Sequence, residues 1–138
     1  MLDDALKQNI QTAYTCWLDA RGFRARRGQR QMIAEIARAF GAEQRDDRLL
    51  AIEAGTGTGK TVAYLLAALP IARAHGWRLV ISTATLALQE QLVGRDLPDL
   101  AAASGMHFSF ELAKGRGRSF HFLFFTWSPL STSYPDIN

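Results

Sequence analysis

A glycine-rich run that ends in a lysine and a threonine carries the clearest chemistry in this chain. The run is Ala54-Gly55-Thr56-Gly57-Thr58-Gly59-Lys60-Thr61. Glycine has no Cβ atom, so its backbone can approach a triphosphate closely and turn its N–H groups toward the phosphate oxygens. Lys60 at the start of a helix can reach the β and γ phosphates, and the Thr61 hydroxyl can bind Mg²⁺. The run predicts a loop that binds a magnesium nucleoside triphosphate, with Lys60 and Thr61 as the catalytic pair.

The segments on either side of this loop fit the same prediction. An apolar run indicates a strand over 48–54, and the apolar residues 61–69 indicate a buried helix. Strand, glycine-rich loop and helix, in that order, form a phosphate-binding unit. Ala54 stands where the strict pattern has its first glycine, so a glycine-rich loop without a nucleotide role stays open as the alternative.

The remaining pattern predicts an α/β fold with a parallel sheet. Helices are expected over 4–18, 29–40 and 86–93, with strands over 78–83 and 108–112. We expect residues 21–23 to break the first helix, Gly41 to cap the second, Pro70 to kink or restart the helix after the loop, and Pro98 to mark the end of the region of the helix over 86–93. A helical crossover between the strands at 48–54 and 78–83 would make them parallel.

Size and composition limit what the chain can be. Its 138 residues, 48% of them apolar, suffice for one domain and are too few for two nucleotide-binding lobes. The formal net charge is only +3, but five arginines crowd into one segment: Arg21, Arg24, Arg26, Arg27 and Arg30. This cluster fits either a solvated helix face or a patch that contacts phosphates.

Cysteine and histidine usage argues against a metal centre. Cys16 is the single cysteine, so it forms no intramolecular disulfide, and we expect it to be a small buried residue. The three histidines are too scattered to suggest a metal site. The chain shows neither a signal peptide nor an apolar run long enough to span a membrane, which predicts a cytoplasmic protein.

Two blocks of the sequence resemble the DinG-type helicases of superfamily 2, which are related to the XPD-like enzymes. Residues 50–66 resemble their motif I, in which alanine is common at the position of Ala54. Residues 80–92 resemble their motif Ia, which holds single-stranded DNA. The hydroxyls of Thr83 and Thr85, with Gln89, are the DNA contacts that the resemblance implies. Taken alone, this second block also fits an ordinary strand and helix.

Two shorter segments extend the resemblance. Arg26, Gln29 and Met32 match the Arg-x-x-Gln-x-x-Met signature, in which the glutamine recognises adenine. A polar first turn of an amphipathic helix is the alternative. Residues 113–118 resemble the Lys-Gly-Arg segment that precedes the iron-sulfur domain, which makes Lys114 and Arg116 candidate DNA contacts. A basic glycine-rich turn is the alternative there.

The resemblance implies an incomplete phosphate-loop (RecA-like) motor domain over residues 24–118, preceded by a helical lead-in over 1–23. ATP and Mg²⁺ are the implied cofactors, and single-stranded DNA is the implied partner. Relatives carry a 4Fe-4S cluster, but no cysteine follows Arg118 here, and neither an Asp-Glu-x-His box nor a second lobe is present. The implied nucleotide contacts are Arg26, Gln29 and every residue from Ala54 to Thr61.

The tail, 119–138, loses the resemblance and crowds aromatic residues, with Asp136 its single charged residue. We expect it to come from a frameshift or a miscalled gene end; a hydrophobic strand that packs on the core is the alternative. The leading interpretation is the N-terminal fragment of an ATP-dependent 5′ to 3′ DNA helicase. A nucleotide- or DNA-binding module without hydrolysis, and a different small phosphate-loop enzyme such as a kinase, are the alternatives.

Overall fold

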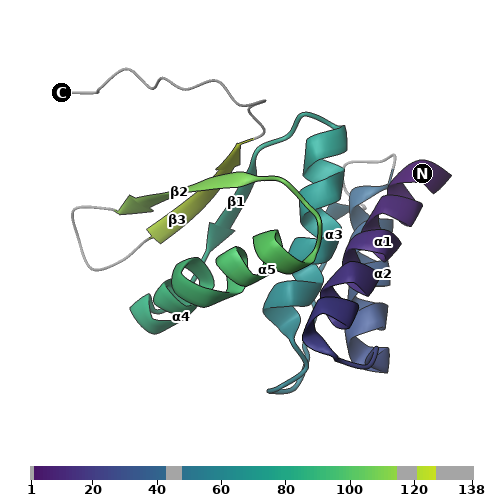
Figure 1. The fold of residues 1–138 in the computed structure, drawn as a ribbon. Helices are drawn as coiled ribbons and strands as arrows, with labels where there is room; N and C mark the ends of the chain where they lie inside the picture. The colour runs from purple at the N-terminus through teal and green to yellow at the C-terminus, as the bar shows by residue number, and fades with distance from the viewer. Residues whose placement is uncertain (1, 43–47, 115–120, 127–138) are drawn as a thin grey trace.

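Three long helices form one side of the molecule and a small sheet forms the other (Figure 1). The computed structural model describes residues 2–42, 48–114 and 121–126, and it describes Lys114 and the last strand by their backbone alone. The long helices are α1 (Asp4–Arg21), α2 (Arg27–Phe40) and α3 (Lys60–Ala74). None of the helices in this described part combines the length and apolar character needed to cross a bilayer.

The ends of α1 follow from local chemistry. The Asp3 carboxylate accepts a hydrogen bond from the Leu6 amide at 2.6 Å, which satisfies one of the free N–H groups of the first turn. Gly22 ends the helix in the left-handed conformation, at a φ of 62°. The predicted break at 21–23 is confirmed. One helix face is buried through residues spaced three and four apart, namely Leu6, Ile10, Ala13, Tyr14, Trp17 and Leu18.

Helix α3 is the centre of the hydrophobic core. It packs against α1, α2 and β1 (Leu79–Ser82), and Leu65, Leu66 and Leu69 are fully buried. The prediction of a helix apolar nearly all round is therefore confirmed. Pro70 lies inside the helix, which continues for four residues beyond it.

A single helical stretch with an irregular middle follows β1. It consists of α4 (Leu86–Gln91), a π-helical segment η2 (Leu92–Asp96) and α5 (Leu97–Ala103). Pro98 lies within this stretch, in the first turn of α5 directly after the π-helical segment, so the expectation that it ends this region is wrong. Leu92, Leu97 and Leu100 join this stretch to the core.

The sheet has three strands in the order β1-β3-β2, with β2 at Ser109–Lys114 and β3 at His121–Thr126. Both pairings are antiparallel, so the predicted parallel sheet is not what the described residues form. The strands over 78–83 and 108–112 are confirmed in type. Residues 121–126 fill the middle of the sheet, and the frameshift origin of the tail stays a prediction.

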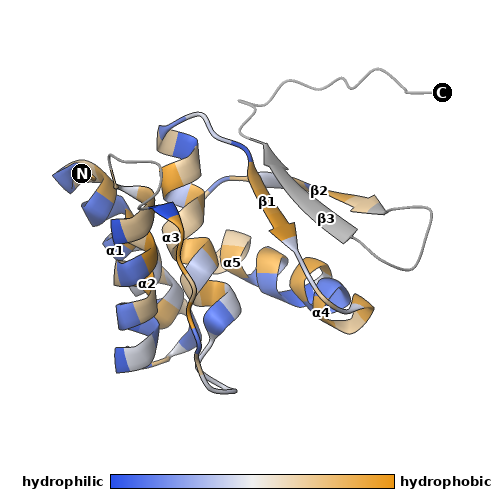
Figure 2. Ribbon diagram, turned by 180° about the vertical axis from the view of Figure 1, so that it is seen from behind, coloured by the Kyte–Doolittle hydropathy of each residue, from blue (hydrophilic) through white to orange (hydrophobic). Residues whose placement is uncertain are grey.

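Two local predictions are wrong. Residues 49–54 contain no strand: the segment runs alongside the helices as an extended apolar stretch without ladder partners (Figure 2). An apolar run forms a strand only when another strand pairs with it, and in the described residues β1 pairs with β3 instead. Cys16 is exposed rather than buried, because its position on α1 falls outside the buried face.

Candidate nucleotide-binding site

The glycine-rich loop enters α3 through two left-handed glycines. Gly57 has a φ of 76° and Gly59 a φ of 78°, a region that residues with a Cβ atom rarely adopt. Gly59 is also the N-cap of α3, so its conformation sets where the helix begins. The first amides of α3, which have no partner within the helix, therefore lie at the loop. The predicted loop thus leads directly into the first turn of the predicted helix.

The Lys60 ammonium is hydrogen-bonded to backbone carbonyls of its own loop. Its Nζ donates to the carbonyl oxygen of Ala54 at 2.6 Å and to that of Gly55 at 3.1 Å. The Thr58 hydroxyl donates to the same Gly55 oxygen at 2.7 Å. Both acceptors of the ammonium are uncharged and its side chain is exposed. Because an ammonium is attracted more strongly to an anionic oxygen than to a neutral one, a phosphate would be the better partner for this ammonium.

Thr61 and Tyr64 interact one turn apart on α3. Burial raises the pKa of the Tyr64 hydroxyl, a hydrogen bond with Thr61 lowers it, and the carboxylate of Asp96 raises it. Burial is the largest of these effects, so the tyrosine is held in its neutral form. Thr61, the predicted magnesium ligand, is therefore hydrogen-bonded to Tyr64.

The first turn of α2 holds the loop from the side. The Arg26 guanidinium donates from Nη1 to the carbonyl oxygen of Gly57 at 2.6 Å, and Gln29 donates from Nε2 to that of Gly59 at 3.3 Å. These bonds join residues about thirty positions apart in the chain. The structure thus brings Arg26 and Gln29 to the phosphate loop, which is where the sequence pattern expects the nucleotide.

Tyr14 is a site residue that the sequence reasoning missed. Its hydroxyl donates to Gln29 Oε1 at 3.0 Å and accepts a hydrogen bond from the Arg26 amide at 3.3 Å. The residue comes from the buried face of α1, and nothing in its sequence neighbourhood separates it from an ordinary core residue. Its contact with Gln29 depends on how α1 and α2 pack, which a single sequence does not reveal.

A groove of about 780 Å³ opens beside the loop, between the end of α1, the start of α2 and the α4–α5 stretch. Its wall includes Trp17 and Phe23, whose rings meet edge to face with centroids 5.5 Å apart. Phe23 is half exposed and was also missed from the sequence. An exposed aromatic ring beside a phosphate loop gives a planar base a surface on which to stack.

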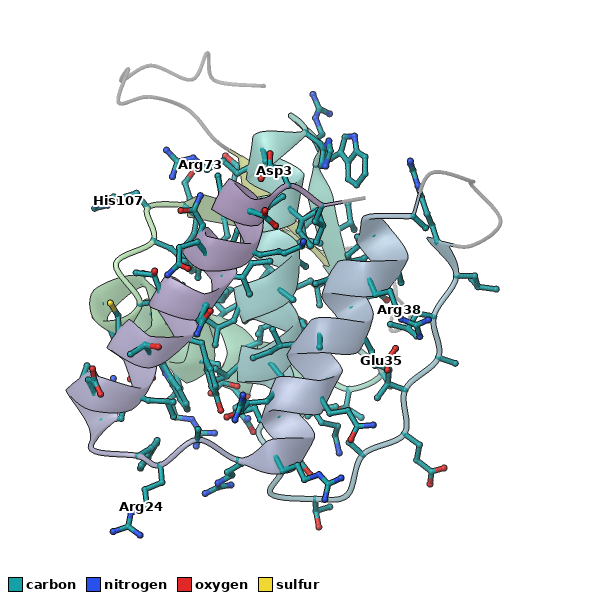
Figure 3. All side chains as sticks on the ribbon, turned by 90° about the vertical axis from the view of Figure 1, so that its right-hand side faces the viewer. Asp3, Arg24, Glu35, Arg38, Arg73 and His107 are labelled. Carbon is teal, nitrogen blue, oxygen red and sulfur yellow. The ribbon has the colours of Figure 1, made fainter. Side chains whose placement is uncertain are left out.

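The groove carries more positive than negative charge. Five basic residues line it, Arg21, Arg24, Arg26, Lys60 and Arg95, against two acidic ones, Asp96 and Asp99. Asp99 already pairs with Arg21 and accepts a hydrogen bond from Trp17 Nε1 at 3.2 Å. Figure 3 shows Arg24 at the loop end of the molecule, with Arg73 and His107 toward the opposite end. This balance suits a polyanionic ligand.

The arginine cluster seen in the sequence divides into two groups. Arg21, Arg24 and Arg26 line the groove, whereas Arg27 and Arg30 are exposed on α2 and do not line it. The solvated helix face describes Arg27 and Arg30, whereas contact of the other three with phosphates stays a prediction.

The motif Ia block lies at the end of β1 and the start of α4. The Thr85 hydroxyl accepts from the Leu88 amide at 3.2 Å as the cap of α4, and the Thr83 hydroxyl donates to the carbonyl oxygen of Thr85 at 3.3 Å. Gln89 is buried, and its Oε1 has no hydrogen-bond partner among the described residues. Both hydroxyls thus have local partners, and Gln89 points away from solvent.

The other predicted contacts are placed only in part. Ala54 contributes its carbonyl oxygen to the Lys60 ammonium, and Thr56 lines the groove. The backbone of Lys114 ends β2, and Arg116 lies outside the described residues. Within the described ranges, no group of three or more histidine, cysteine, aspartate or glutamate residues is arranged to hold a metal ion.

Comparison with known proteins assigns this loop and its surroundings to a family. The sequence model of the DEAD/DEAH box helicases matches residues 26–117, a span that begins at the Arg26 contact and contains the whole loop. The chain belongs to the DEAD/DEAH box helicase family. Membership implies a phosphate-loop NTPase fold of mixed helix and strand. No solved structure matches the chain significantly.

Curated relatives of this DEAD/DEAH box chain are named ATP-dependent DNA helicase DinG. The protein of Photobacterium profundum is 44% identical over 120 residues, which are 86% of this chain and 17% of the relative. That of Salmonella typhimurium is 45% identical over 85% of this chain and 16% of the relative. That of Escherichia coli K12 is 47% identical over 70% of this chain and 13% of the relative. The chain therefore spans about a sixth of the length of these helicases.

Proposed function

We propose that this chain binds MgATP through residues 54–61, as the nucleotide-binding part of an ATP-dependent DNA helicase. The observation that carries the proposal is the loop itself, held by Arg26 and Gln29 and closed by the Lys60 ammonium beside a basic groove. The amides at the start of α3 and this ammonium form a donor set suited to phosphate oxygens. The helicase activity in this proposal rests on the names of the DinG relatives.

The base is proposed to lie against the start of α2. Gln29 offers an amide that can both donate to and accept from adenine, and Arg26 lies next to it in the groove. The exposed ring of Phe23 supports stacking of the base on the same wall. A nucleotide with its phosphates at the loop and its base near Phe23 would occupy the groove along its length.

The donor sets fit Mg²⁺ and do not fit an iron-sulfur cluster. The Thr61 hydroxyl is an oxygen ligand of the kind Mg²⁺ prefers, and a bound Mg²⁺ would neutralise charge on the phosphates. Lys60 would bind phosphate oxygens beside it. A 4Fe-4S cluster requires four thiolates, whereas the chain has the single cysteine Cys16. We therefore assign no cluster to these residues.

Single-stranded DNA is the proposed macromolecular partner, in the cytoplasm. Thr83, Thr85 and Gln89 are the proposed contacts at motif Ia, with Lys114 and Arg116 farther along the chain. The hydroxyls of the first two have local partners that DNA phosphates would have to replace. The order of loop, helix and strand supports an incomplete RecA-like motor, and translocation from 5′ to 3′ is part of the proposal for the longer protein.

Hydrolysis is proposed to need residues that this chain does not supply. The sequence has no adjacent Asp-Glu pair to anchor the metal and position the attacking water. A second candidate function, a binding module without hydrolysis, is favoured by that same observation. Phosphate release measured with and without single-stranded DNA distinguishes ATP hydrolysis from binding alone. DNA-stimulated release that Lys60→Ala abolishes would contradict the proposal that hydrolysis needs further residues.

The test of nucleotide binding is titration with a fluorescent ATP analogue. Lys60→Ala should weaken binding by about 10- to 100-fold, the effect expected of a lost charge-assisted hydrogen bond. Lys7→Ala is the matched control, because Lys7 is an exposed lysine of α1 paired with Asp4. Equal binding by Lys60→Ala and the unaltered chain would rule the proposal out.

A further inference from the structure

We propose that Tyr14 determines the base specificity of the nucleotide site, because it fixes the orientation of the Gln29 amide. The inference rests on the proposed function, in which Gln29 faces the base. Tyr14 and Gln29 come from different helices, fifteen residues apart, and both side chains are buried. Tyr14 does not line the groove, so it acts on the base through Gln29 as a positioning residue.

The hydrogen-bond partners allow one orientation of the amide. A backbone carbonyl only accepts, so the Gly59 oxygen at 3.3 Å must face the amide nitrogen of Gln29. The amide oxygen then faces Tyr14. The Tyr14 hydroxyl has one proton and already accepts from the Arg26 amide, so it donates that proton to Gln29 Oε1 at 3.0 Å. All three bonds agree on one arrangement.

The surroundings leave the amide little room to leave this arrangement. Gln29 is only 3% exposed. Its nitrogen packs directly on the Cα of Gly59, where a Cβ atom would collide with it. Gly59 is therefore needed for its left-handed backbone and also for the space it leaves to Gln29. The amide is clamped by Tyr14 on one side and Gly59 on the other.

The clamp sets what Gln29 can offer to a base. One of its two N–H groups is committed to Gly59 and one lone pair of its oxygen to Tyr14, which leaves one donor and one acceptor for a base. Adenine presents the complement, the N7 acceptor and the N6 amino donor. Guanine presents two acceptors, N7 and O6, and an amide with one free N–H cannot satisfy both. The fixed amide therefore favours adenine.

The test compares ATP and GTP analogues on the full chain. The unaltered protein should prefer the ATP analogue, and Tyr14→Phe should reduce this preference by about tenfold, because a released amide can turn both N–H groups toward guanine. Thr15→Val is the matched control, since it removes a neighbouring exposed hydroxyl of α1 that donates to the Gln11 carbonyl. Gln29→Ala should remove the preference, and adding Tyr14→Phe to it should change nothing further.

Each outcome decides the proposal. An equal loss of affinity for both analogues in Tyr14→Phe, or an unchanged preference, would overturn it. If circular dichroism shows that Tyr14→Phe is unfolded, the test is made on the unaltered chain. ATP should then bind more tightly than both 7-deaza-ATP and ITP. Equal binding of ATP and ITP overturns the proposal. Failure of the proposed function looks different, because nucleotide binding would then be absent or insensitive to Lys60→Ala.

Discussion

The helix α3 and two segments outside it, residues 49–54 before the loop and the start of α4, differ in how far their leucines are buried. In α3, Leu65, Leu66 and Leu69 are 0% exposed. In contrast, Leu49 before the loop is 91% exposed and Leu86 on α4 is 58% exposed. Leucines are thus enclosed in α3 and left in solvent before the loop and at the start of α4.

This difference shows what holds the loop in place. Hydrogen bonds from Arg26 and Gln29 reach it from the helical side, and α3 continues it into the core. The segment 49–54 on its other side makes no strand ladder in the described residues. The nucleotide site is therefore positioned mainly by helix packing, and the segment before the loop adds the Ala54 carbonyl that accepts from Lys60.

Stability should follow the same division, and this is the largest effect we expect. Leu66→Ala removes a fully buried side chain and should lower the free energy of unfolding by about 2–5 kcal/mol. Leu49→Ala, the same change at an exposed position, should alter it by less than about 0.5 kcal/mol. Urea unfolding followed by circular dichroism measures both. Similar losses for the two variants would show that the segment before the loop is packed after all.

Nucleotide affinity should depend on the anchor from α2. Arg26→Ala removes the bond to the Gly57 carbonyl and should weaken binding of an ATP analogue by about five- to tenfold, the effect of one charge-assisted bond at an exposed site. Arg30→Ala, which removes an exposed arginine of the same helix outside the groove, should have little effect. Equal effects of the two changes would mean that only the overall charge matters.

A smaller effect is expected at alkaline pH from Tyr64. Its folded pKa lies above the value of about 10 in the unfolded chain, chiefly because of burial. The folded state then holds the proton more tightly, so this contribution to stability is complete below about pH 10 and is lost as the pH rises through the folded pKa. Between about pH 9 and 11, the unfolding temperature of Tyr64→Phe should fall less steeply than that of the unaltered chain. Identical slopes would contradict a buried, neutral Tyr64.

Local patterns predicted the helices well and the sheet poorly. The spacing of Met32, Ile33 and Ile36 predicted α2, and its observed bounds differ from the expected ones by two residues at one end. The apolar run before the loop has the same composition as a strand, but a strand depends on partners elsewhere in the chain. Pro98 was misjudged because a proline at the start of a helix and one after its end look alike in sequence.

The site divides in the same way. The loop residues and the pair Arg26 and Gln29 were predictable, since glycines, one lysine and a spaced signature carry them. Tyr14, Phe23 and the burial of Gln89 were not, because they depend on how helices distant in sequence pack together. Side-chain chemistry at fixed local spacing is visible in one sequence, whereas contacts between elements are not.

The most direct test of the central claim is an NMR titration of the ¹⁵N-labelled chain with MgATP. Binding at the loop predicts the largest shifts in the backbone amides of residues 55–61 and in the side-chain amide of Gln29. The amides of 121–126, in the sheet, should move least. Shifts concentrated in the sheet, or no shifts at millimolar MgATP, would contradict the assignment of this loop as the nucleotide site.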